Sequence, residues 1–305
     1  MKKIAVITTA FGFGLESREK TYADLFAKFG LSSWYCSRDD LMASPSGVEG
    51  VIVGVEKADE AFLSACVDLK IAMKFGVGLD NFDREYARKV GIEIANMPGI
   101  NSDAVAEMVF ALMLCVSRRI NTLDSSCKRG EYTQMCSHSI LNKTLGIVGM
   151  GAIGKKVARI AQAFNMRCIG YDVQSVEADG ITSVSFDELL QNSDVITIHI
   201  PLTNENRHLF STPEFAKMKR DAIILNTSRG GIIDEAALAQ AVIEGRVRGA
   251  GIDVYESKQS VYPLSTLESV VCTPHVAAYT HETLRHMERT AIEKLSAYLG
   301  CVRLP

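Results

Sequence analysis

The sequence predicts an α/β protein made of two domains, each with a parallel sheet that carries helices on both faces. Apolar runs of strand length alternate with helical patterns along most of the chain, and this alternation is typical of βαβ units and parallel sheets. The chain has 305 residues, which is enough for about two domains of ordinary size. A Pro98-Gly99 pair breaks the alternation, which resumes from Thr144 onward, so we expect two α/β parts.

The first part contains the expected elements of one sheet and its helices. Short apolar runs predict strands at 3–8, 50–55, 71–75 and 92–95. The segments between them predict helices at 17–29, 58–67 and 84–90. Gly30 and Gly91 follow two of these helices, where glycine commonly ends a helix because it tolerates the left-handed conformation.

The second part repeats this alternation with more elements. Ser102 can cap a helix over 103–116 that is apolar nearly all round, and the more polar residues 117–143 predict a connecting segment. Strands are expected at 145–149, 168–171, 194–200, 222–226, 249–254 and 270–273. Helices are expected at 152–165, 186–191, 213–218, 235–244 and 281–299.

Composition and charge argue against several classes of protein. The net charge of −3 is spread along the chain, so we expect no nucleic-acid partner. The longest apolar run, 108–116, is far short of the ~20 residues that span a bilayer, and the run at 3–8 is too short for a signal peptide. The eight cysteines are scattered without a C-x-x-C pair, which favours free thiols in a reducing cytoplasm over disulfides or a metal site.

Gly149, Gly151 and Gly154 form a G-x-G-x-x-G turn between an apolar strand and an amphipathic helix. The first glycine allows a tight turn, the second lets the backbone approach a pyrophosphate, and the third lets the helix pack on the strand. The helix N-terminus offers unpaired N–H groups and a positive dipole end to phosphates. We therefore predict a dinucleotide site; the alternative is a glycine turn that binds nothing.

Asp172 ends the next expected strand, eighteen residues after Gly154. A carboxylate there can accept hydrogen bonds from both hydroxyl groups of an adenosine ribose, whereas it would repel a 2′-phosphate. The predicted cofactor is therefore NAD rather than NADP.

Polar residues follow three further strands of the second part. Arg229 follows one strand, Asp253 lies at the end of another, and His275 follows the last. Ligands gather at the carboxyl ends of parallel strands, an arginine grips a carboxylate in a bidentate way, and histidine transfers protons near neutral pH. Each residue alone has an ordinary structural explanation, such as an arginine that caps a surface turn or a structural histidine.

A fourth loop, Gly76-Val77-Gly78, follows a strand of the first part. Its glycines leave backbone N–H groups open to an anion such as a substrate carboxylate. A tight turn between a strand and a helix is the alternative explanation.

Seven stretches carry a wider resemblance. They are KFGVGLDNFD (74–83), NMPGINSDAVAE (96–107), GIVGMGAIG (146–154), HIPLT (199–203), MKRDAIILNTSRGGIIDEAAL (218–238), GIDVYE (251–256) and TPHVAAYT (273–280). In this order they resemble the D-2-hydroxyacid dehydrogenase family, which contains D-3-phosphoglycerate, glycerate, hydroxypyruvate and D-lactate enzymes. The resemblance implies two Rossmann-like domains, a substrate-binding one formed by 1–98 with 281–305 and an NAD-binding one formed by 99–280. It also implies a homodimer or higher homo-oligomer.

The resemblance also implies roles for individual residues. By position, His275 corresponds to the general acid/base, and Arg229 to the residue that binds the substrate carboxylate and polarises the carbonyl. Val77 and Gly78 correspond to the substrate-carboxylate loop. The implied cofactor contacts are Gly149, Gly151, Ala152, Ile153, Gly154, Asp172, Pro201, Thr227, Ser228, Asp253 and Ala277.

One departure from the family concerns catalysis. The family usually has a glutamate five residues after the aspartate of GIDVYE, where it hydrogen-bonds the histidine. This chain has Lys258 there, which cannot accept that bond and whose charge would disfavour the protonated form of a neighbouring His275. Glu256 could take the role if the loop shifts, and the sequence leaves this open.

The expected function is an NAD-dependent oxidoreductase that transfers hydride between nicotinamide and a small 2-hydroxy or 2-oxo acid. Phosphoglycerate enzymes usually carry Arg-Ser after the second strand of the first domain, whereas this chain has Gly54-Val55. We therefore expect a 2-hydroxyacid dehydrogenase of undefined substrate, although a name such as phosphoglycerate dehydrogenase could be given by similarity. Because of Lys258, an NAD(H)-binding sensor or interaction protein with little activity is the alternative.

Overall fold

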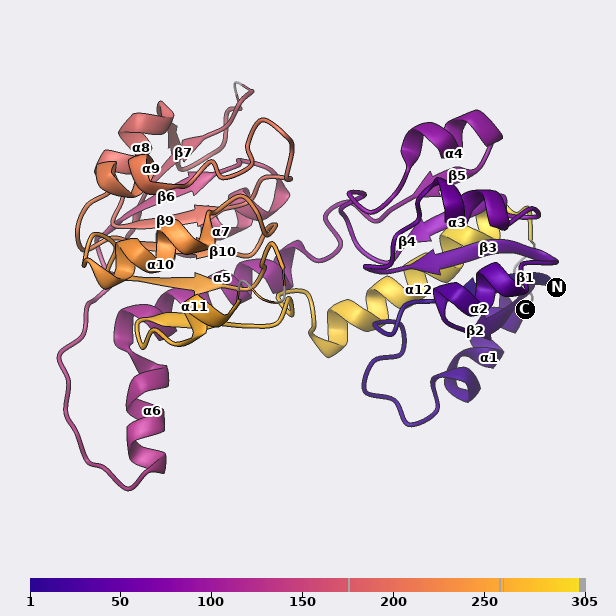
Figure 1. Cartoon of the computed structure of the whole chain (residues 1–305), viewed down its shortest axis with the longest axis horizontal. Coiled ribbons are helices and arrows are strands. Elements are labelled where there is room, and N and C mark those ends of the chain that lie inside the picture. The colour runs from indigo at the N-terminus through magenta and orange to yellow at the C-terminus, as the bar shows by residue number, and fades with distance from the viewer. Residues whose placement is uncertain (175, 258, 260, 302–305) are drawn as a thin grey trace. The chain divides into compact units, whose positions relative to one another are not determined.

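The computed structural model describes residues 1–174, 176–257, 259 and 261–301, and Lys258 lies outside the described residues. The chain divides into two compact units, which we call unit 1 and unit 2 (Figure 1). Unit 1 is Met1–Asn101 together with the segment from Tyr279 onward, and unit 2 is Ser102–Ala278. Each unit holds one parallel sheet between layers of helices, which confirms the predicted α/β class.

Unit 1 has a sheet of five parallel strands in the order β2-β1-β3-β4-β5. Its strands are β1 (Lys2–Val6), β2 (Leu31–Tyr35), β3 (Val48–Val53), β4 (Ile71–Lys74) and β5 (Glu93–Ala95). Its helices are α1 (Arg18–Lys28), α2 (Arg38–Ala43), α3 (Glu60–Ala65), α4 (Arg84–Val90) and α12 (His281–Tyr298). The order reverses direction between β1 and β3, so the carboxyl ends of these two strands form the switch point of the sheet.

The helices of unit 1 cover both faces of its sheet, with α1 and α12 on one face and α2, α3 and α4 on the other. Alternate residues of each strand point to opposite faces, so Ile4 and Val6 of β1 lie in the core with α1 and α12, whereas Ala5 lies in the core with α2, α3 and α4. Helix α12 comes from the end of the chain and buries one stripe of its surface: Leu284, Met287, Ala291, Ile292 and Leu295. This stripe completes the core of unit 1.

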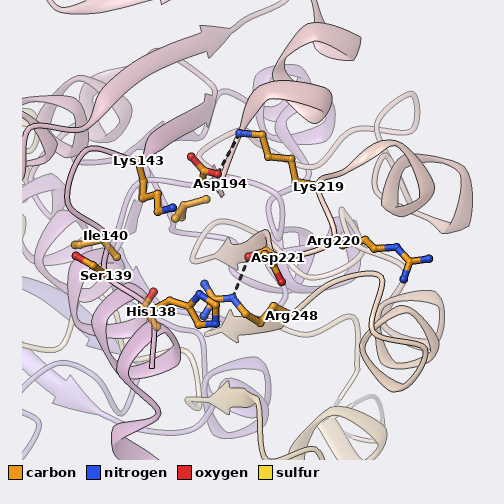
Figure 2. A pocket seen from close by; sticks show the side chains of 11 residues that line it. His138, Ser139, Ile140, Lys143, Asp194, Lys219, Arg220, Asp221 and Arg248 are labelled. Atoms are coloured by element: carbon orange, nitrogen blue, oxygen red, sulfur yellow. Dashed lines mark hydrogen bonds and ion pairs between the residues drawn. The ribbon is translucent and has the colours of Figure 1, made fainter. Parts of the chain in front are cut away.

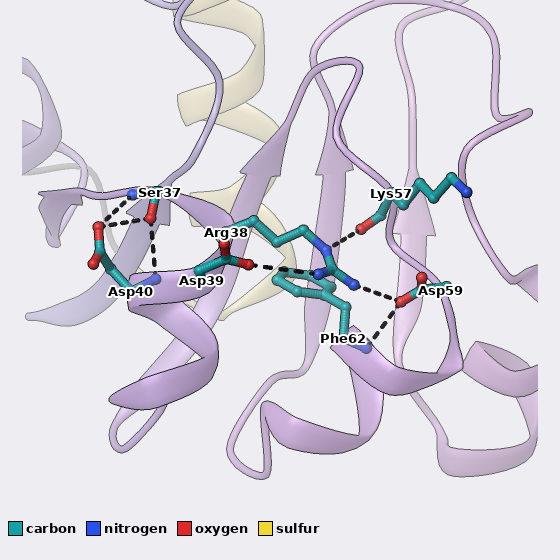
Figure 3. Close-up of polar contacts among 7 residues, drawn as sticks. All are labelled: Ser37, Arg38, Asp39, Asp40, Lys57, Asp59 and Phe62. Carbon is teal, nitrogen blue, oxygen red and sulfur yellow. Dashed lines mark hydrogen bonds and ion pairs between the residues drawn. The ribbon is translucent and has the colours of Figure 1, made fainter.

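Local polar contacts fix the two short helices α2 and α3 (Figure 3). Ser37 and Asp40 form a capping box that satisfies backbone N–H groups at the start of α2. The Arg38 guanidinium donates to the Lys57 carbonyl oxygen at 2.8 Å and to Asp59 Oδ1 at 2.7 Å, and it lies over the Phe62 ring. Since Asp59 also caps α3, Arg38 ties the two helices together.

Unit 2 has a sheet of seven parallel strands in the order β12-β11-β10-β9-β6-β7-β8. Its strands are β6 (Thr144–Val148), β7 (Arg167–Tyr171), β8 (Ile181–Ser183), β9 (Val195–Ile198), β10 (Ile223–Asn226), β11 (Gly249–Ile252) and β12 (Val270–Cys272). Its helices are α5 (Ser102–Arg118), α6 (Ile120–Lys128), α7 (Ala152–Ala163), α8 (Phe186–Asn192), α9 (Thr212–Lys217), α10 (Glu235–Ile243) and α11 (Val261–Ser265). Here the switch point lies between β6 and β9.

The core of unit 2 also has two layers. Helices α5 and α7 pack on one face of the sheet, and α8 to α11 pack on the other. The carboxyl ends of all seven strands meet at one edge, which therefore gathers the loops that follow β6, β7, β9, β10, β11 and β12. The described residues include no helix that is long and apolar enough to cross a membrane.

The sequence prediction missed five elements: β2, α2, α6, β8 and α11. Strands β2 and β8 are edge strands with few buried residues, so they lack the apolar run by which a buried strand is found. The prediction of a connecting segment over 117–143 was wrong for α6, which buries only Ser126 and so shows no core-facing stripe.

Candidate functional site

The glycine turn after β6 requires its first and third glycines for packing. Gly149 has a positive φ of 97°, and a Cβ there would lie 2.6 Å from the His199 carbonyl oxygen. A Cβ on Gly154 would clash with the Gly149 carbonyl oxygen, because α7 crosses the turn at close range. Both glycines therefore serve the tight turn that the sequence predicted.

The second glycine of the turn faces open space. Nothing lies within 4 Å of the position that a Cβ of Gly151 would take, and its φ of −78° suits any residue. Gly151 is the N-cap of the twelve-residue helix α7 and gives it no side-chain cap, so the first N–H groups of the helix are left for another acceptor. An open approach to an uncapped helix N-terminus suits a pyrophosphate.

Asp172 follows β7 beside the glycine turn. Its Oδ2 accepts a hydrogen bond from Met150 N at 2.8 Å, and its Oδ1 accepts one from Gln174 N at 3.2 Å. The carboxylate is half-buried and thus held at a fixed place relative to the turn. It keeps acceptor capacity for the hydroxyl groups of a ribose.

Two buried polar atoms without a hydrogen-bond partner lie at the ends of adjacent strands. His199 follows β9 and Thr227 follows β10; within the described structure His199 Nδ1 and Thr227 Oγ1 have no partner. The other ring nitrogen, His199 Nε2, lies 2.9 Å from Thr197 Oγ1, and burial lowers the pKa of the ring to about 3. Buried orphan polar atoms are costly, so a bound group that pairs with them is expected here. Pro201, two residues on, is exposed, and its carbonyl oxygen accepts a bond from Asn206 Nδ2 at 2.7 Å.

Asn226 shapes the loop that carries Arg229. Its Oδ1 accepts hydrogen bonds from the N–H and the hydroxyl of Ser228 at 3.0 and 2.7 Å, and its Nδ2 donates to the Arg229 carbonyl oxygen at 2.9 Å. The Arg229 guanidinium is half-buried and donates to the Ser228 carbonyl oxygen at 2.7 Å. Gly230 lies so close to the backbone of Tyr255 and Glu256 that a Cβ would clash with it.

Asp253 is fully buried and shapes the loop that carries His275. Its Oδ1 accepts bonds from Thr273 Oγ1 at 2.6 Å and Val276 N at 2.9 Å, and its Oδ2 accepts one from Ala277 N at 2.9 Å. Its carbonyl oxygen accepts a bond from His275 N at 2.8 Å. The structure thus gives Asp253 a structural role, and a direct cofactor contact by Asp253 or by the buried Ala277 stays a prediction.

His275 lies exposed in the turn that Asp253 holds. Its backbone is in the left-handed region with φ 58°, a conformation that is uncommon for a residue with a side chain. The turn follows β12, so His275 lies at the same edge of the sheet as the glycine turn and Arg229. Such backbone conformations often occur where a side chain must be aimed at a ligand.

Glu256 does not take the place beside His275 that the sequence left open for it. Its carboxylate forms an ion pair with Arg207, and its Oε2 lies 2.9 Å from His208 Nε2. Both oxygens are therefore engaged by the loop that follows β9. The physical reason is that two nitrogen donors from that loop attract the carboxylate, and Glu235 Oε1 fixes the Glu256 amide at 2.9 Å.

The loop of unit 1 that was predicted to bind a carboxylate has free donors. In the described structure the amides of Val77 and Gly78 donate no backbone hydrogen bond. The loop is fixed on both sides, because Asn96 Nδ2 donates to the Val77 carbonyl oxygen at 2.6 Å and Met97 N donates to the Gly76 carbonyl oxygen at 3.1 Å. Gly76 has a φ of 142°, which needs glycine.

These features of unit 2 fit a bound NAD molecule. One edge of the sheet carries all of them: the open position at Gly151 and the uncapped start of α7, the Asp172 carboxylate held by hydrogen bonds, and the unpaired buried atoms of His199 and Thr227. No group of three or more His, Cys, Asp or Glu residues able to hold a metal exists among the described residues. Sequence reasoning had given no role to His199, although it opens the HIPLT motif, or to Asn226, which opens NTSRGG.

Comparisons with known proteins point in the same direction. Residues 110–277 match the NAD-binding domain model of the D-isomer specific 2-hydroxyacid dehydrogenases. A hydroxypyruvate reductase from Thermotoga maritima is 38% identical over 278 residues, covering 88% of this chain and 91% of the relative. A glyoxylate reductase from Thermococcus litoralis is 38% identical over 262 residues, covering 81% of this chain and 79% of the relative.

A solved structure shares the whole fold. The D-lactate dehydrogenase from Aquifex aeolicus, solved with NAD and lactic acid, is 27% identical and has a TM-score of 0.85 over 98% of this chain and 95% of that one. These findings confirm the predicted family resemblance and the predicted cofactor. The chain therefore belongs to the D-isomer specific 2-hydroxyacid dehydrogenase family, and it is an NAD-dependent oxidoreductase that acts on the CH–OH group of 2-hydroxy acids.

Proposed function

We propose that this enzyme reduces small, unphosphorylated 2-oxo acids of the glyoxylate and hydroxypyruvate class with NADH. The observation that carries the proposal is the Asp253-held turn, which presents an exposed His275 at the sheet edge that also holds the open glycine turn and Arg229. Two relatives with 38% identity are a hydroxypyruvate reductase and a glyoxylate reductase, which supports this substrate class.

The proposed chemistry divides among residues of unit 2. When bound, NADH supplies the hydride that the carbonyl carbon of the 2-oxo acid accepts. The Arg229 guanidinium holds the carboxylate and stabilises the negative charge that develops on the carbonyl oxygen. His275 donates a proton to that oxygen, and Asp253 keeps the turn of His275 in place.

For unit 1 we propose that the amides of Val77 and Gly78 bind a substrate carboxylate. Their free N–H groups in a fixed loop support this role. The absence of an Arg-Ser pair at Gly54-Val55 supports an unphosphorylated substrate. A Cβ on Gly54 would clash with the Thr8 side chain, so the position of Gly54 does not admit a larger residue without rearrangement.

We further propose a reducing, cytoplasmic setting and a homodimer or higher homo-oligomer. All eight cysteines are free, which supports a reducing compartment. The oligomeric state follows from the family resemblance, and the mass of the purified chain by light scattering tests it; a monomer at micromolar concentration would contradict it.

The test of the proposed function combines a substrate panel with one variant. Wild-type protein is mixed with NADH and glyoxylate, hydroxypyruvate, pyruvate or 3-phosphohydroxypyruvate, and NADH absorbance is followed. We expect the highest kcat/KM for glyoxylate or hydroxypyruvate. In His275→Ala, kcat should fall roughly 10²- to 10⁴-fold, because a general acid is lost, while NADH affinity stays within about twofold.

His286→Ala is the matched control, because His286 is exposed on α12, and its turnover should equal that of the wild type. Equal turnover in His275→Ala would refute the role of His275. Tight NADH binding without turnover of any acid would refute the proposed reaction and would favour an NAD(H) sensor.

A further inference from the structure

A cavity of about 220 Å³ lies at the edge of the unit 2 sheet opposite to the cofactor edge (Figure 2). Its lining comes from the segments that precede four parallel strands and from the end of α5. Lys143 precedes β6, Asp194 precedes β9, Asp221 precedes β10 and Arg248 precedes β11. The cavity is thus built by the amino ends of strands whose carboxyl ends build the cofactor site.

The charge of this lining is mainly positive. The lining contains four basic side chains and two acidic ones, together with His138. The basic ones are Lys143, Lys219, Arg220 and Arg248, and the acidic ones are Asp194 and Asp221. Asp194 is already neutralised, because its Oδ1 accepts from Lys219 Nζ at 3.1 Å and its Oδ2 accepts from Thr144 N at 2.8 Å. Figure 2 shows Arg220 extending away from the other labelled side chains. With Lys219 and Asp194 paired, the charges that remain at the cavity are those of Lys143 and Arg248 against Asp221, and this balance favours an anion.

Two polar groups of the lining can donate further hydrogen bonds. Ser117 is 1% exposed, it lines the cavity, and its Oγ has no hydrogen-bond partner within the described structure. Arg248 is half-buried, and among the described residues the only hydrogen bond of its guanidinium runs from Nε to the Asp221 carbonyl oxygen at 2.9 Å. Burial lowers the pKa of this guanidinium, and the charge of Asp221 offsets that effect only in part. A buried hydroxyl and a half-buried guanidinium in one cavity indicate a missing acceptor.

The size of the cavity restricts the acceptor. A volume of about 220 Å³ is below the ~300 Å³ at which drug-sized ligand pockets begin, so the cavity suits a small group rather than a whole nucleotide. A phosphate group does fit, and its oxygens can accept from a guanidinium fork, a hydroxyl and an ammonium at the same time.

We propose that this cavity binds a phosphate group, either of inorganic phosphate or of a small phosphate ester, with Ser117, Lys143 and Arg248 as its donors. The strands between this cavity and the cofactor edge have four or five residues each, which separates the two sites by about 13–17 Å. The site is therefore distinct from the site of hydride transfer.

The test uses the full chain saturated with NADH, so that the pyrophosphate site is filled. Inorganic phosphate, glycerol 3-phosphate and AMP are titrated separately by calorimetry at constant ionic strength. The wild type should bind inorganic phosphate or glycerol 3-phosphate at one saturable site, and the tighter of the two identifies the source of the phosphate group. AMP should not bind there.

Two variants address the donors. Ser117→Ala and Lys143→Gln should each weaken phosphate binding about tenfold or more, because a hydrogen bond to a charged group is lost. Without phosphate, Ser117→Ala should not lower the melting temperature, since it removes a hydroxyl that has no partner. Lys217→Gln is the matched control, because Lys217 pairs with Asp187 outside the lining; it should leave phosphate affinity within about twofold.

The proposal is overturned if the wild type shows no saturable phosphate binding in the presence of NADH. It is equally overturned if Ser117→Ala and Lys143→Gln bind phosphate as the wild type does, or if Lys217→Gln weakens binding as much as they do. Binding of AMP that these variants also weaken would refute the size argument.

Discussion

The loops that follow the first strand of each unit differ although the two units share one architecture. In unit 2 the β6 loop is a short glycine turn, and Gly151 faces open space. In unit 1 the β1 loop runs from Ile7 to Ser17, and its Phe11 is fully buried against the rings of Tyr22, Phe26, Tyr35 and Phe75. The first strand lies at the switch point of its sheet in both units.

The unit 1 loop is closed by the chain's own carboxylate. Glu288 of α12 is fully buried; its Oε1 accepts from Gly12 N at 2.7 Å, and its Oε2 contacts the Tyr22 hydroxyl and Arg285 Nη1. The internal acid thus takes an N–H that a ligand anion could otherwise take. A parallel sheet with a switch point therefore does not by itself provide a dinucleotide site; an open turn is also needed.

The largest effect is expected when the internal carboxylate of unit 1 is removed. Glu288→Ala leaves Gly12 N, Tyr22 and Arg285 without their acceptor, and this should lower the free energy of unfolding of unit 1 by about 3–5 kcal/mol. Urea unfolding followed by the fluorescence of Trp34 measures it, because this single tryptophan lies in β2 of unit 1.

Glu293→Ala is the control for this variant. Glu293 forms an exposed ion pair with Arg289 on the same helix, so its loss should change stability by less than about 0.5 kcal/mol. Equal midpoints for Glu288→Ala and the wild type would show that the carboxylate does not hold the loop.

The next effect separates the two functions of the unit 2 glycines. In Gly149→Ala the new side chain would sit on a backbone with positive φ, and its Cβ would clash with the His199 carbonyl oxygen. The variant should therefore destabilise unit 2 by about 2–4 kcal/mol and abolish NADH binding. Gly151→Ala causes neither backbone strain nor a clash, so the variant should keep wild-type stability. Its affinity for NADH should fall at least tenfold, since the methyl group fills the space through which the pyrophosphate approaches.

Circular dichroism melting and an NADH fluorescence titration measure the two quantities. If Gly151→Ala bound NADH with wild-type affinity, the pyrophosphate would not approach at this glycine.

The smallest effect concerns acid stability and the half-buried His199, whose ring Nδ1 is buried. Its pKa is about 3 in the folded chain and about 6.5 in the unfolded chain, so the unfolded chain binds the proton first. The stabilisation is complete above about pH 6.5 and is lost as the pH falls toward 3. Between pH 6.5 and 5 the wild type should lose about 1–2 kcal/mol from this group, a range in which carboxylates have not yet taken up their protons.

Melting temperatures of wild type and His199→Gln from pH 7 to 5 measure the loss. The variant should show a flatter profile over this range. Parallel profiles would contradict a His199 that is neutral in the folded chain.

The sequence was sufficient for the parts of the fold that rest on strong local signals. Buried strands such as β3 and β9 consist mostly of apolar residues, and the helix over 84–90 is bounded by Asp83 and Gly91, so these could be predicted. Edge strands β2 and β8 and the exposed helix α6 carry no such signal, because few of their residues are buried and no apolar pattern is therefore required of them.

Only the parts of the site that belong to local sequence motifs could be predicted. The glycine turn and Asp172 follow from spacing, whereas the structural role of Asp253 and the pairing of Glu256 with Arg207 depend on contacts between loops far apart in sequence. The cavity at Ser117 and Arg248 has no motif at all, since it joins the starts of four strands. Such sites become visible only when the sheet is assembled.

Hydrogen exchange of the wild-type chain with and without NADH tests the contrast between the two loops most directly. The account predicts that NADH slows exchange of the amides at 149–154, which form the open turn and the start of α7, and leaves the amides at 8–16 of unit 1 unchanged. Slower exchange at 8–16 with no change at 149–154 would contradict it.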